Sequence, residues 1–288
     1  MKMSVIKFML MFVILLGLGG AVYYGATAKA DSYDLNNTKI LLVFNGDHDK
    51  EAANLLASMQ KYTPELVPLI VICVSDDKGK QFAEQHNIPY FALSTINESG
   101  EFMSREMNIM TRRKFEGILH VLGLQKNVLY IDTDIVLLAD PFKYINFDYD
   151  LSVQSDECRA PYKHDYLCTG FMYIKSNFKT KSFFTEAIVK IENSNYKLAD
   201  QCALNLLIGR DQLLKKSADP LRMNVTVLDV CKFPNGCRYF EGSDKKCRKR
   251  DAIIVHNNYL TGIDKKMQRF KEYGLLFTDS KNNIATSS

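Results

Sequence analysis

Two aspartates, Asp132 and Asp134, stand close together within the apolar stretch VLYIDTDIVLLADPF, which covers Val128 to Phe142. Removing a charged side chain from water is costly unless a partner compensates it. Closely spaced carboxylates are hard oxygen ligands that suit Mg²⁺ or Mn²⁺, and a metal held by them can bind the phosphates of a substrate. Residues i and i+2 of an extended chain point the same way, so we expect both carboxylates to face one ion. The alternative, a turn with two solvated acids, fits poorly because apolar residues flank the pair on both sides.

The segments before this pair alternate between strand and helix patterns. Apolar strands separated by amphipathic helices indicate an α/β fold whose mostly parallel sheet is covered on both faces. Ligands of such sheets bind beyond the carboxyl ends of the strands, where the aspartate pair is expected. The pattern predicts strands at residues 38–46, 66–75, 89–93 and 127–134, and helices at residues 47–62, 78–87 and 104–122, the first with Asp47 as a possible cap.

The N-terminus is expected to meet a membrane. A basic start at residues 1–7 precedes an uncharged apolar stretch at residues 8–28, which has about the length of a membrane-spanning helix. Two outcomes compete: an uncleaved signal anchor followed by a stem at residues 29–37, or a signal peptide cleaved after Ala28-Lys29-Ala30. The anchor is favoured because the apolar run is longer than the usual core of a signal peptide. It predicts a single-pass type II membrane protein, whereas cleavage predicts a secreted one.

Both outcomes place the remaining chain in the Golgi or endomembrane lumen or outside the cell. Three N-glycosylation sequons, which begin at Asn36, Asn97 and Asn224, agree with this location. The seven cysteines also fit a compartment in which disulfides persist. A zinc site is the rival interpretation, but no pair has the short Cys-x-x-Cys spacing and no His is interleaved. We therefore expect disulfides among Cys158, Cys168, Cys231, Cys237 and Cys247, with the pairing left open, and buried thiols at Cys73 and Cys202.

Length and composition exclude some classes of protein. The chain has 288 residues, of which 47% are hydrophobic, so it can form one large α/β domain or two small ones and is not disordered over most of its length. A net charge of +4 is too mild to indicate nucleic acid as a partner. The one basic run, between Lys245 and Arg250, is interpreted as a solvated loop.

The order of several sequence pieces resembles the glycosyltransferase A-type fold. It is most similar to the nucleotide-diphospho-sugar transferase family that includes plant xylosyl- and arabinosyltransferases. One Asp-x-Asp is a weak signal, but six pieces in order are a strong one. The resemblance implies a Rossmann-like mixed sheet flanked by helices, a catalytic domain over residues 38–276 and a polar tail at residues 277–288. The pieces are ILLVFNGD, TRRKFEGILHVLGLQKN, VLYIDTDIVLLADPF, CTGFMYIKSN, ADQCALNLLI and VHNNYLTGIDKKMQRFKEYG.

The resemblance also implies a metal site. Asp132 and Asp134 would bind Mn²⁺ or Mg²⁺, and His256, at the end of the strand-like DAIIVHN, would be the third ligand. A lone His is otherwise a hydrogen-bonded core residue. Lys265 and Lys266 follow at a helix start, and one of them is expected to reach the diphosphate of a sugar nucleotide. Their alternative is a pair of plain surface lysines.

Other residues acquire roles at the donor through the resemblance. Asp200 and Gln201 open a helix, so Asp200 is expected to cap it and, by resemblance, to face the donor sugar. Gly170 lacks a side chain and would leave room for the sugar beside the metal. The remaining predicted substrate contacts are Arg113 and Lys114 on the long helix, with Arg112 less favoured, and Asn45, Gly46 and Asp47 at the end of the first strand, where the nucleoside should lie.

The sequence thus predicts a metal-dependent transferase that moves a sugar from a nucleotide-diphosphate sugar, with UDP favoured, to a glycan or glycoprotein acceptor with retention of configuration. Two other classes compete. A haloacid-dehalogenase-type phosphohydrolase fits YIDTDIV, with Asp132 as nucleophile and Asp134 as acid/base, although that motif normally starts its domain. A non-catalytic sugar-binding module is the third possibility, although the expected acidic and basic positions are all occupied. The chain has no Trp, so stacking of an acceptor would fall to Tyr162, Tyr166 or Tyr259.

Overall fold

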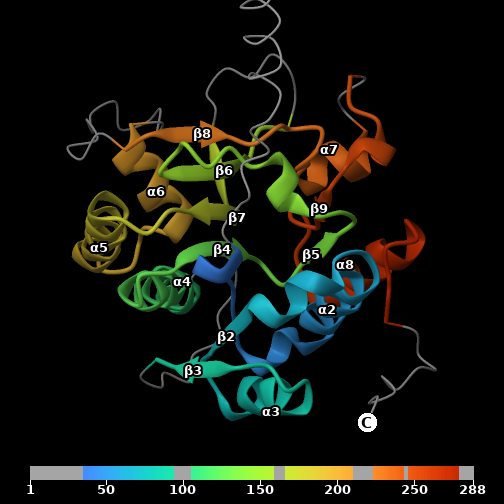
Figure 1. Cartoon of the computed structure of the whole chain (residues 1–288), viewed down its shortest axis with the longest axis horizontal. Helices are drawn as coiled ribbons and strands as arrows, with labels where there is room; N and C mark the ends of the chain where they lie inside the picture. Colours follow the sequence, from blue (N-terminus) through green and yellow to red (C-terminus); the bar gives the residue numbers. More distant parts are fainter. Residues whose placement is uncertain (1–34, 94–104, 159–165, 210–222, 243–245, 279–288) are drawn as a thin grey trace, which may run out of the picture. The chain divides into compact units, whose positions relative to one another are not determined.

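A seven-stranded sheet runs through the computed structural model of the chain (Figure 1). The structure describes residues 35–93, 105–158, 166–209, 223–242 and 246–278. The predicted membrane segment at residues 8–28, the sequon at Asn97 and Tyr162 lie outside these residues. Within the described part of the chain, no helix combines the length and the apolar character needed to cross a membrane.

The sheet is mixed and mostly parallel, which confirms this part of the predicted fold. Its strand order is β3-β2-β1-β4-β7-β6-β8. Parallel pairing joins β3 (Tyr90–Ala92), β2 (Ile70–Val74), β1 (Thr38–Phe44) and β4 (Asn127–Ile131). Next, β7 (Leu167–Ile174) is antiparallel to both β4 and β6 (Leu151–Ser155), and β8 (Val225–Val227) is parallel to β6. A separate antiparallel ribbon consists of β5 (Ile135–Leu137) and β9 (Ile254–His256).

Helices cover both faces of the sheet, as Figure 1 shows. On one face lie α4 (Arg105–Gly123), α5 (Phe178–Asn193) and α6 (Asp200–Ile208), and buried side chains such as Phe115, Phe184 and Leu204 pack with Tyr130 and Met172 of the sheet. On the other side are α2 (Asp49–Tyr62), α7 (Gly236–Glu241) and α8 (Ile263–Glu272). The helix α3 (Asp77–Gln85) follows β2. The continuous apolar strands are therefore buried on both faces.

Two local predictions are wrong. The strand predicted at residues 66–75 begins only at Ile70, because Pro64–Leu69 form a 3-10 helix with Pro68 inside it, and proline cannot donate to a strand ladder. Asp47 does not cap the following helix. It lies in the 3-10 turn Gly46–His48, and α2 begins at Asp49 with His48 at the N-cap.

The cysteines form two disulfides, Cys158–Cys237 and Cys231–Cys247. This outcome agrees with the expectation of disulfides rather than zinc. Cys73 is a buried thiol as predicted, whereas Cys202 is only half-buried. Cys168, which was expected among the disulfide cysteines, is instead a buried thiol. The sequon residues Asn36 and Asn224 are exposed.

Candidate active site

Asp132, Asp134 and His256 converge at the carboxyl edge of the sheet. Their potential ligand atoms all lie within 4.8 Å of one another. The His256 Nε2 atom is 3.2 Å from Asp134 Oδ1 and 3.8 Å from Asp132 Oδ2. The two aspartates do not lie on one extended strand, so the predicted alternation is wrong: β4 ends at Ile131, and a tight turn leads into β5. They meet instead because β5 pairs with β9, which sets Ile135 opposite His256.

The imidazole of His256 is oriented by Gln154, the fourth residue of β6. The Gln154 side chain donates through Nε2 to the carbonyl oxygens of Phe233 (3.1 Å) and Pro234 (3.0 Å). Its Oε1 atom must then face His256, where it lies 2.8 Å from Nδ1 and accepts a hydrogen bond. With the proton on Nδ1, the lone pair of Nε2 faces the two aspartates. This outer contact is typical of metal-binding histidines.

The donor set fits a divalent cation. Two carboxylates and one imidazole suit Mn²⁺ or Mg²⁺, and Asp134 and His256 are almost fully buried, at 6% and 2% exposure. One ammonium group lies beside each aspartate: Lys266 Nζ is 2.8 Å from Asp134 Oδ2, and Lys114 Nζ is 3.3 Å from Asp132 Oδ1. Burial alone would raise the pKa of Asp134, but the ammonium group of Lys266 holds it well below its usual range.

Gly170 in β7 lets this group of side chains approach the sheet. A Cβ atom built at Gly170 would lie 2.2 Å from His256 Cε1 and 2.8 Å from Asp132 Oδ2. The predicted reason for this glycine is therefore corrected, because the space that it leaves is filled by the imidazole and the carboxylate rather than left open for a sugar.

We expect Gly170→Ala to disturb the metal site more than the fold. The added methyl group must displace His256 and Asp132, and overpacking of this kind costs about 1–3 kcal/mol. Calorimetric titration with Mn²⁺ should show affinity lowered by about tenfold or more. Gly123→Ala is the matched control, because a Cβ there meets nothing within 4 Å. Unchanged Mn²⁺ affinity in Gly170→Ala would contradict the placement of His256.

Asp200 is linked to the same group through Lys114. Lys114 Nζ lies 2.8 Å from Asp200 Oδ2, and the hydroxyl of Thr169 donates to the same oxygen at 2.8 Å. Burial alone would lower the pKa of Lys114, but Asp132 and Asp200 hold it above its usual range. Asp200 is the first residue of α6 and not its N-cap, which is Ala199, so the expected capping role is wrong. Its buried carboxylate serves the ion pair instead.

Gln201 turns toward a second acid, Asp156. Gln201 Oε1 accepts from the backbone N–H of Thr169 at 3.3 Å, and Nε2 donates to Asp156 Oδ2 at 2.9 Å. Asn258 Nδ2 is 3.4 Å from Asp156 Oδ1, and the hydroxyl of Tyr259 donates to the Asp156 carbonyl oxygen. Burial raises the pKa of Asp156 to about 6, against the opposing hydrogen bond from Gln201. The Tyr259 ring is 48% exposed and borders this part of the site.

This pKa predicts how stability changes with pH. The native protein holds a proton on Asp156 up to about pH 6, whereas the unfolded chain releases it near 3.8, so the native state binds more protons between these values. The free energy of unfolding of the wild type should therefore fall as pH rises from about 4 to about 6, by about 1–3 kcal/mol from this residue. Asp156→Asn should lack that fall. Urea unfolding at several pH values measures both slopes, and parallel curves would contradict the shift.

The end of β1 carries the residues predicted to bind the nucleoside. Asn45 is 8% exposed, and its Oδ1 atom has no hydrogen-bond partner among the described residues. The N–H of Gly46 donates to both carboxylate oxygens of Asp76 at 3.0 Å, and a Cβ on Gly46 would lie 1.9 Å from Lys78 Cβ. Asp47 is exposed and lies 3.5 Å from Lys78 Nζ. These residues lie next to β4 at the same edge of the sheet.

Only some of the predicted cationic residues lie at the site. Lys266 lies at the site, 2.8 Å from Asp134 and 3.7 Å from the buried Glu51, whereas Lys265 is exposed and lines a surface cavity between α7 and α8. Arg113 is buried, and its charge lies near the Cys73 thiol of β2. Arg112 pairs with Glu116 and Glu192 instead.

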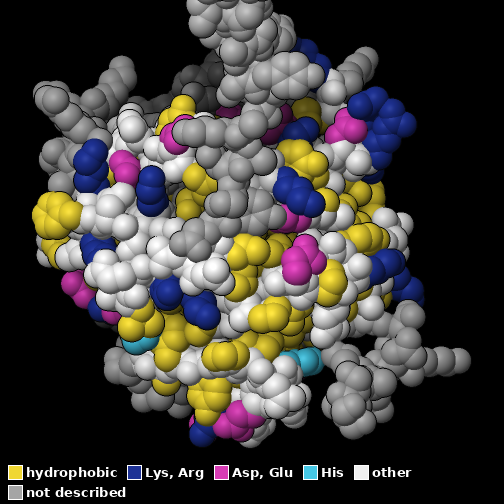
Figure 2. Space-filling model, viewed as in Figure 1, with side chains coloured by type: hydrophobic (Ala, Val, Ile, Leu, Met, Phe, Trp, Pro, Cys, Tyr) yellow, Lys and Arg dark blue, Asp and Glu magenta, His cyan; other side chains and the backbone are white. Residues whose placement is uncertain are grey.

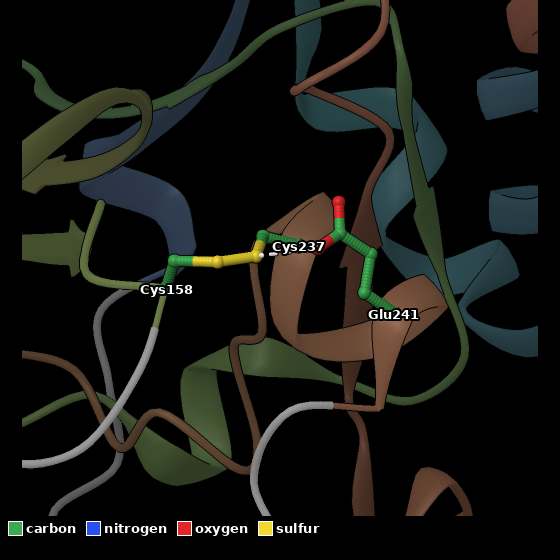
Figure 3. A group of neighbouring side chains, drawn as sticks. All are labelled: Cys158, Cys237 and Glu241. Atoms are coloured by element: carbon green, nitrogen blue, oxygen red, sulfur yellow. Dashed lines mark hydrogen bonds between the residues drawn. A yellow bond between two sulfur atoms is a disulfide. The ribbon is translucent and has the colours of Figure 1, made fainter.

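A second group that could hold a metal consists of Cys158, Cys237 and Glu241. Figure 3 shows these side chains, with the two sulfur atoms bonded to each other. Thiolates are the form of cysteine that binds metals, and a disulfide has none. The bond instead ties the segment after β6, which carries Asp156, to α7.

Sequence reasoning missed Gln154, Asp156, Thr169 and Glu51. A usable signal exists for the first two: Gln154 and Asp156 are polar residues in and directly after a strand whose five residues are all buried. A buried polar side chain needs a hydrogen-bond partner, so such a position at a strand end indicates a site. Glu51 gives no comparable signal, because an acid in the first turn of a helix is ordinary.

The fold matches that of solved glycosyltransferases. A structure of an active-site mutant of LgtC aligns with a TM-score of 0.55 at 13% identity, covering 84% of this chain and 98% of that one. The bifunctional glycosyltransferase WbbM aligns with a TM-score of 0.50 at 11% identity, covering 84% and 52% of the two chains. At these identities the likeness concerns the fold alone. The sheet and the helix layers therefore define a glycosyltransferase-like α/β fold.

The sequence places the chain more narrowly. The profile of the nucleotide-diphospho-sugar transferase family matches residues 65–270, so the chain belongs to that family. An Arabidopsis thaliana UDP-D-xylose:L-fucose α-1,3-D-xylosyltransferase is 31% identical over 189 residues, or 59% of this chain and 49% of the relative. A Dictyostelium discoideum UDP-galactose:fucoside α-3-galactosyltransferase is 28% identical over 86% of this chain and 44% of the relative. The chain spans about half the length of these relatives. Membership of this family sets aside the phosphohydrolase alternative.

Proposed function

We propose that the protein is a metal-dependent glycosyltransferase that moves a sugar from a nucleotide-diphosphate sugar, with UDP as the nucleotide, to a hydroxyl of a glycan or glycoprotein. The observation that carries the proposal is the convergence of Asp132, Asp134 and His256 at the carboxyl edge of the sheet, between the ammonium groups of Lys114 and Lys266. A site that combines hard ligands with nearby cations suits a diphosphate. A bound Mn²⁺ or Mg²⁺ would polarise the diphosphate and stabilise its departure.

Lys266 is proposed to bind the diphosphate. Its ammonium group lies between Asp134 and Glu51, and Glu51 in turn lies 2.6 Å from the ring of His48. Glu51 is 1% exposed, so little water screens its attraction to Lys266 across 3.7 Å. Lys265 is proposed to contribute at most at the rim, because it is exposed.

Asp200 is proposed to act at the donor sugar, with Gln201 positioning it. Thr169 and Lys114 fix one oxygen of the Asp200 carboxylate, which leaves the other to face the sugar. Transfer with retention can then follow two routes: a glycosyl-Asp200 intermediate with two inversions, or attack on the same face, in which an oxygen of the leaving diphosphate takes the proton of the acceptor. In both routes the Asp200 carboxylate faces the donor sugar, and Lys114 holds it in place from 2.8 Å.

The acceptor is proposed to be a glycan that contains fucose. Two relatives are named as enzymes that transfer to L-fucose or to a fucoside with α linkage, one from UDP-D-xylose and one from UDP-galactose. Asp156 accepts a hydrogen bond from Gln201, and Tyr259 bonds to Asp156, so the two residues offer a carboxylate and an exposed aromatic ring to an acceptor sugar. Arabinose is a third donor sugar, as a β-arabinofuranosyltransferase from Arabidopsis is 26% identical.

A donor panel tests the proposed activity. The full chain is incubated with UDP-xylose, UDP-galactose and UDP-arabinose, with Mn²⁺ and with or without methyl fucoside, and release of UDP is measured. One donor should give UDP release that the fucoside increases. Proton NMR of the first product from an α-linked donor should show an α linkage, and a β linkage would overturn retention. No UDP release with any donor would favour the sugar-binding module over the transferase.

The chain is proposed to be a type II membrane protein of the Golgi or another endomembrane compartment. Residues 1–7 would be cytosolic and residues 8–28 would span the membrane, followed by a stem at 29–37, the luminal catalytic domain at 38–276 and the tail at 277–288. Exposed Asn36 and Asn224 and the two disulfides support a luminal location.

Glycosylation checks this topology. Expression in a secretory host should add glycans, because both exposed sequons would face the glycosylation machinery. Asn224→Gln and Asn36→Gln should each raise the mobility of the chain on a denaturing gel by one glycan, and glycosidase treatment should remove the difference. A chain that carries no glycan on Asn36, Asn97 or Asn224 would withdraw this support.

A further inference from the structure

A second cavity, of about 410 Å³, lies at the other end of the β5–β9 ribbon from the aspartate pair and His256. It borders Ile253, which directly precedes β9, whereas His256 ends that strand. The cavity is thus separate from the candidate active site. Its lining residues are Tyr144, Asp229, Cys231, Lys232, Lys246, Arg248, Arg250, Asp251 and Ile253.

The lining carries an excess of positive charge. Four cationic side chains stand against two carboxylates, an excess of two charges. Arg248 already holds Asp251 through two bonds of 2.7 and 3.2 Å, and Asp229 Oδ1 accepts from the backbone N–H groups of Cys231 and Lys232. Among the described residues, Lys232 and Arg250 have no ion pair. Figure 2 shows Lys and Arg side chains gathered at the upper right edge, over the segment that follows α7.

The walls of this cavity are held in place by covalent and backbone bonds. The disulfide Cys231–Cys247 joins the two segments that supply the cations. The carbonyl oxygen of Lys232 accepts from the N–H of Ile253 at 2.7 Å. This bond joins the segment of Lys232 to the residue directly before β9. Cations held close together repel one another unless an anion lies between them. A rigid frame that keeps them together favours a bound anion, because little ordering remains to be done when the anion binds.

The chemistry of the lining favours a sugar as the carrier of that anion. Guanidinium and ammonium groups match a carboxylate or a sulfate ester. The ring of Tyr144 is 44% exposed beneath Lys232, whose Nζ lies 5.3 Å from the ring centroid, and an aromatic face of this kind can pack against a sugar. Asp229 and Asp251 can accept from sugar hydroxyls, whereas they would repel the continuous phosphate backbone of a nucleic acid. A cavity of this volume suits a small ligand group.

We propose that this cavity binds an anionic sugar unit, which carries a carboxylate or a sulfate ester, within an acidic glycan. The basic residues of the loop after α7 are then part of a recognition site rather than a plain solvated surface. Binding at this site does not require sugar transfer, so it stands or falls independently of the proposed activity.

Calorimetric titration of the full chain with two probes tests the proposal. A heparin tetrasaccharide supplies sulfate esters and a tetragalacturonate supplies carboxylates, and the probe that binds more tightly identifies the anion. Lys232→Ser combined with Arg250→Ser should weaken that binding by about tenfold or more, since each substitution removes a charged hydrogen-bond donor from the cavity. Lys80→Ser combined with Lys190→Ser is the matched control, because it removes two surface lysines that form i,i+4 pairs on α3 and α5.

The outcomes are distinct. Wild-type affinity in the control, with an unchanged melting temperature in both double variants, would support the site. The proposal is overturned if neither probe binds at millimolar concentration, or if Lys232→Ser with Arg250→Ser binds as tightly as the wild type. It is also overturned if a DNA oligonucleotide of equal charge binds the wild type as tightly as the sugar probes do, because the cavity would then attract any polyanion.

Discussion

Replacing Asp134 by asparagine is expected to reduce sugar transfer by about a thousandfold. Asp134 lies 3.2 Å from His256 and 2.8 Å from Lys266. It therefore joins the proposed metal group, which consists of Asp132, Asp134 and His256, to the cation proposed to bind the diphosphate. Asparagine has nearly the same shape but no charge, and it binds Mn²⁺ or Mg²⁺ more weakly. The measurement is the rate of UDP release at saturating donor and Mn²⁺, together with a Mn²⁺ titration of the variant.

Asp148→Asn is the matched control for this variant. Asp148 is an exposed aspartate on the loop after the site, so its replacement removes the same charge without touching the metal group. Its activity should equal that of the wild type. Asp132→Asn should reduce transfer as Asp134→Asn does, because both carboxylates face the same group. Full turnover in the double variant Asp132→Asn and Asp134→Asn would exclude the metal site from the reaction.

Asp200→Asn is expected to lower the chemical step by about a hundred- to ten-thousandfold while the affinity for UDP changes little. The amide can still accept the hydrogen bond from Thr169, so the start of α6 should remain in place. It cannot stabilise positive charge on the donor sugar. We expect the diphosphate to stay bound, because Lys266, its proposed partner, does not contact Asp200. Single-turnover kinetics and calorimetric titration with UDP separate the two effects.

Thr169→Val refines this test. It removes the hydroxyl that donates to Asp200 at 2.8 Å but keeps the carboxylate and its pair with Lys114. We expect the rate of Thr169→Val to be about tenfold below that of the wild type and above that of Asp200→Asn. If Asp200→Asn transfers sugar at the wild-type rate, Asp200 is not part of the reaction. If it instead loses UDP affinity as strongly as rate, its role is in binding.

The parallel half of the sheet could be predicted because each strand is a long apolar run. The strands β1, β2 and β4, with the helix α4, follow directly from such runs. The ribbon β5–β9 could not be predicted, since each strand has only three residues and the partners lie far apart in the sequence. That ribbon brings His256 to the aspartates. The prediction that His256 is a metal ligand rested on the resemblance to a family.

The contact partners of the remaining site residues could not be predicted, because they lie far away in the sequence. Gln154 contacts His256 across 102 positions of sequence, and Lys266 contacts Asp134 across 132. The sequence could therefore suggest a lysine near the helix start but could not choose between Lys265 and Lys266. Gly170 was predicted to leave room for a sugar, and only the fold shows that His256 and Asp132 fill the space beside it.

The central claim is that Asp132, Asp134 and His256 hold a divalent cation that binds the diphosphate of a sugar nucleotide. Calorimetric titration of UDP into the full chain, in Mn²⁺ and in EDTA, tests it most directly. UDP should bind in Mn²⁺, and its affinity should fall by about a hundredfold or more in EDTA, a difference of about 2.7 kcal/mol. His256→Ala in Mn²⁺ should approach the affinity seen in EDTA. Equal affinity of the wild type for UDP in Mn²⁺ and in EDTA would contradict the claim.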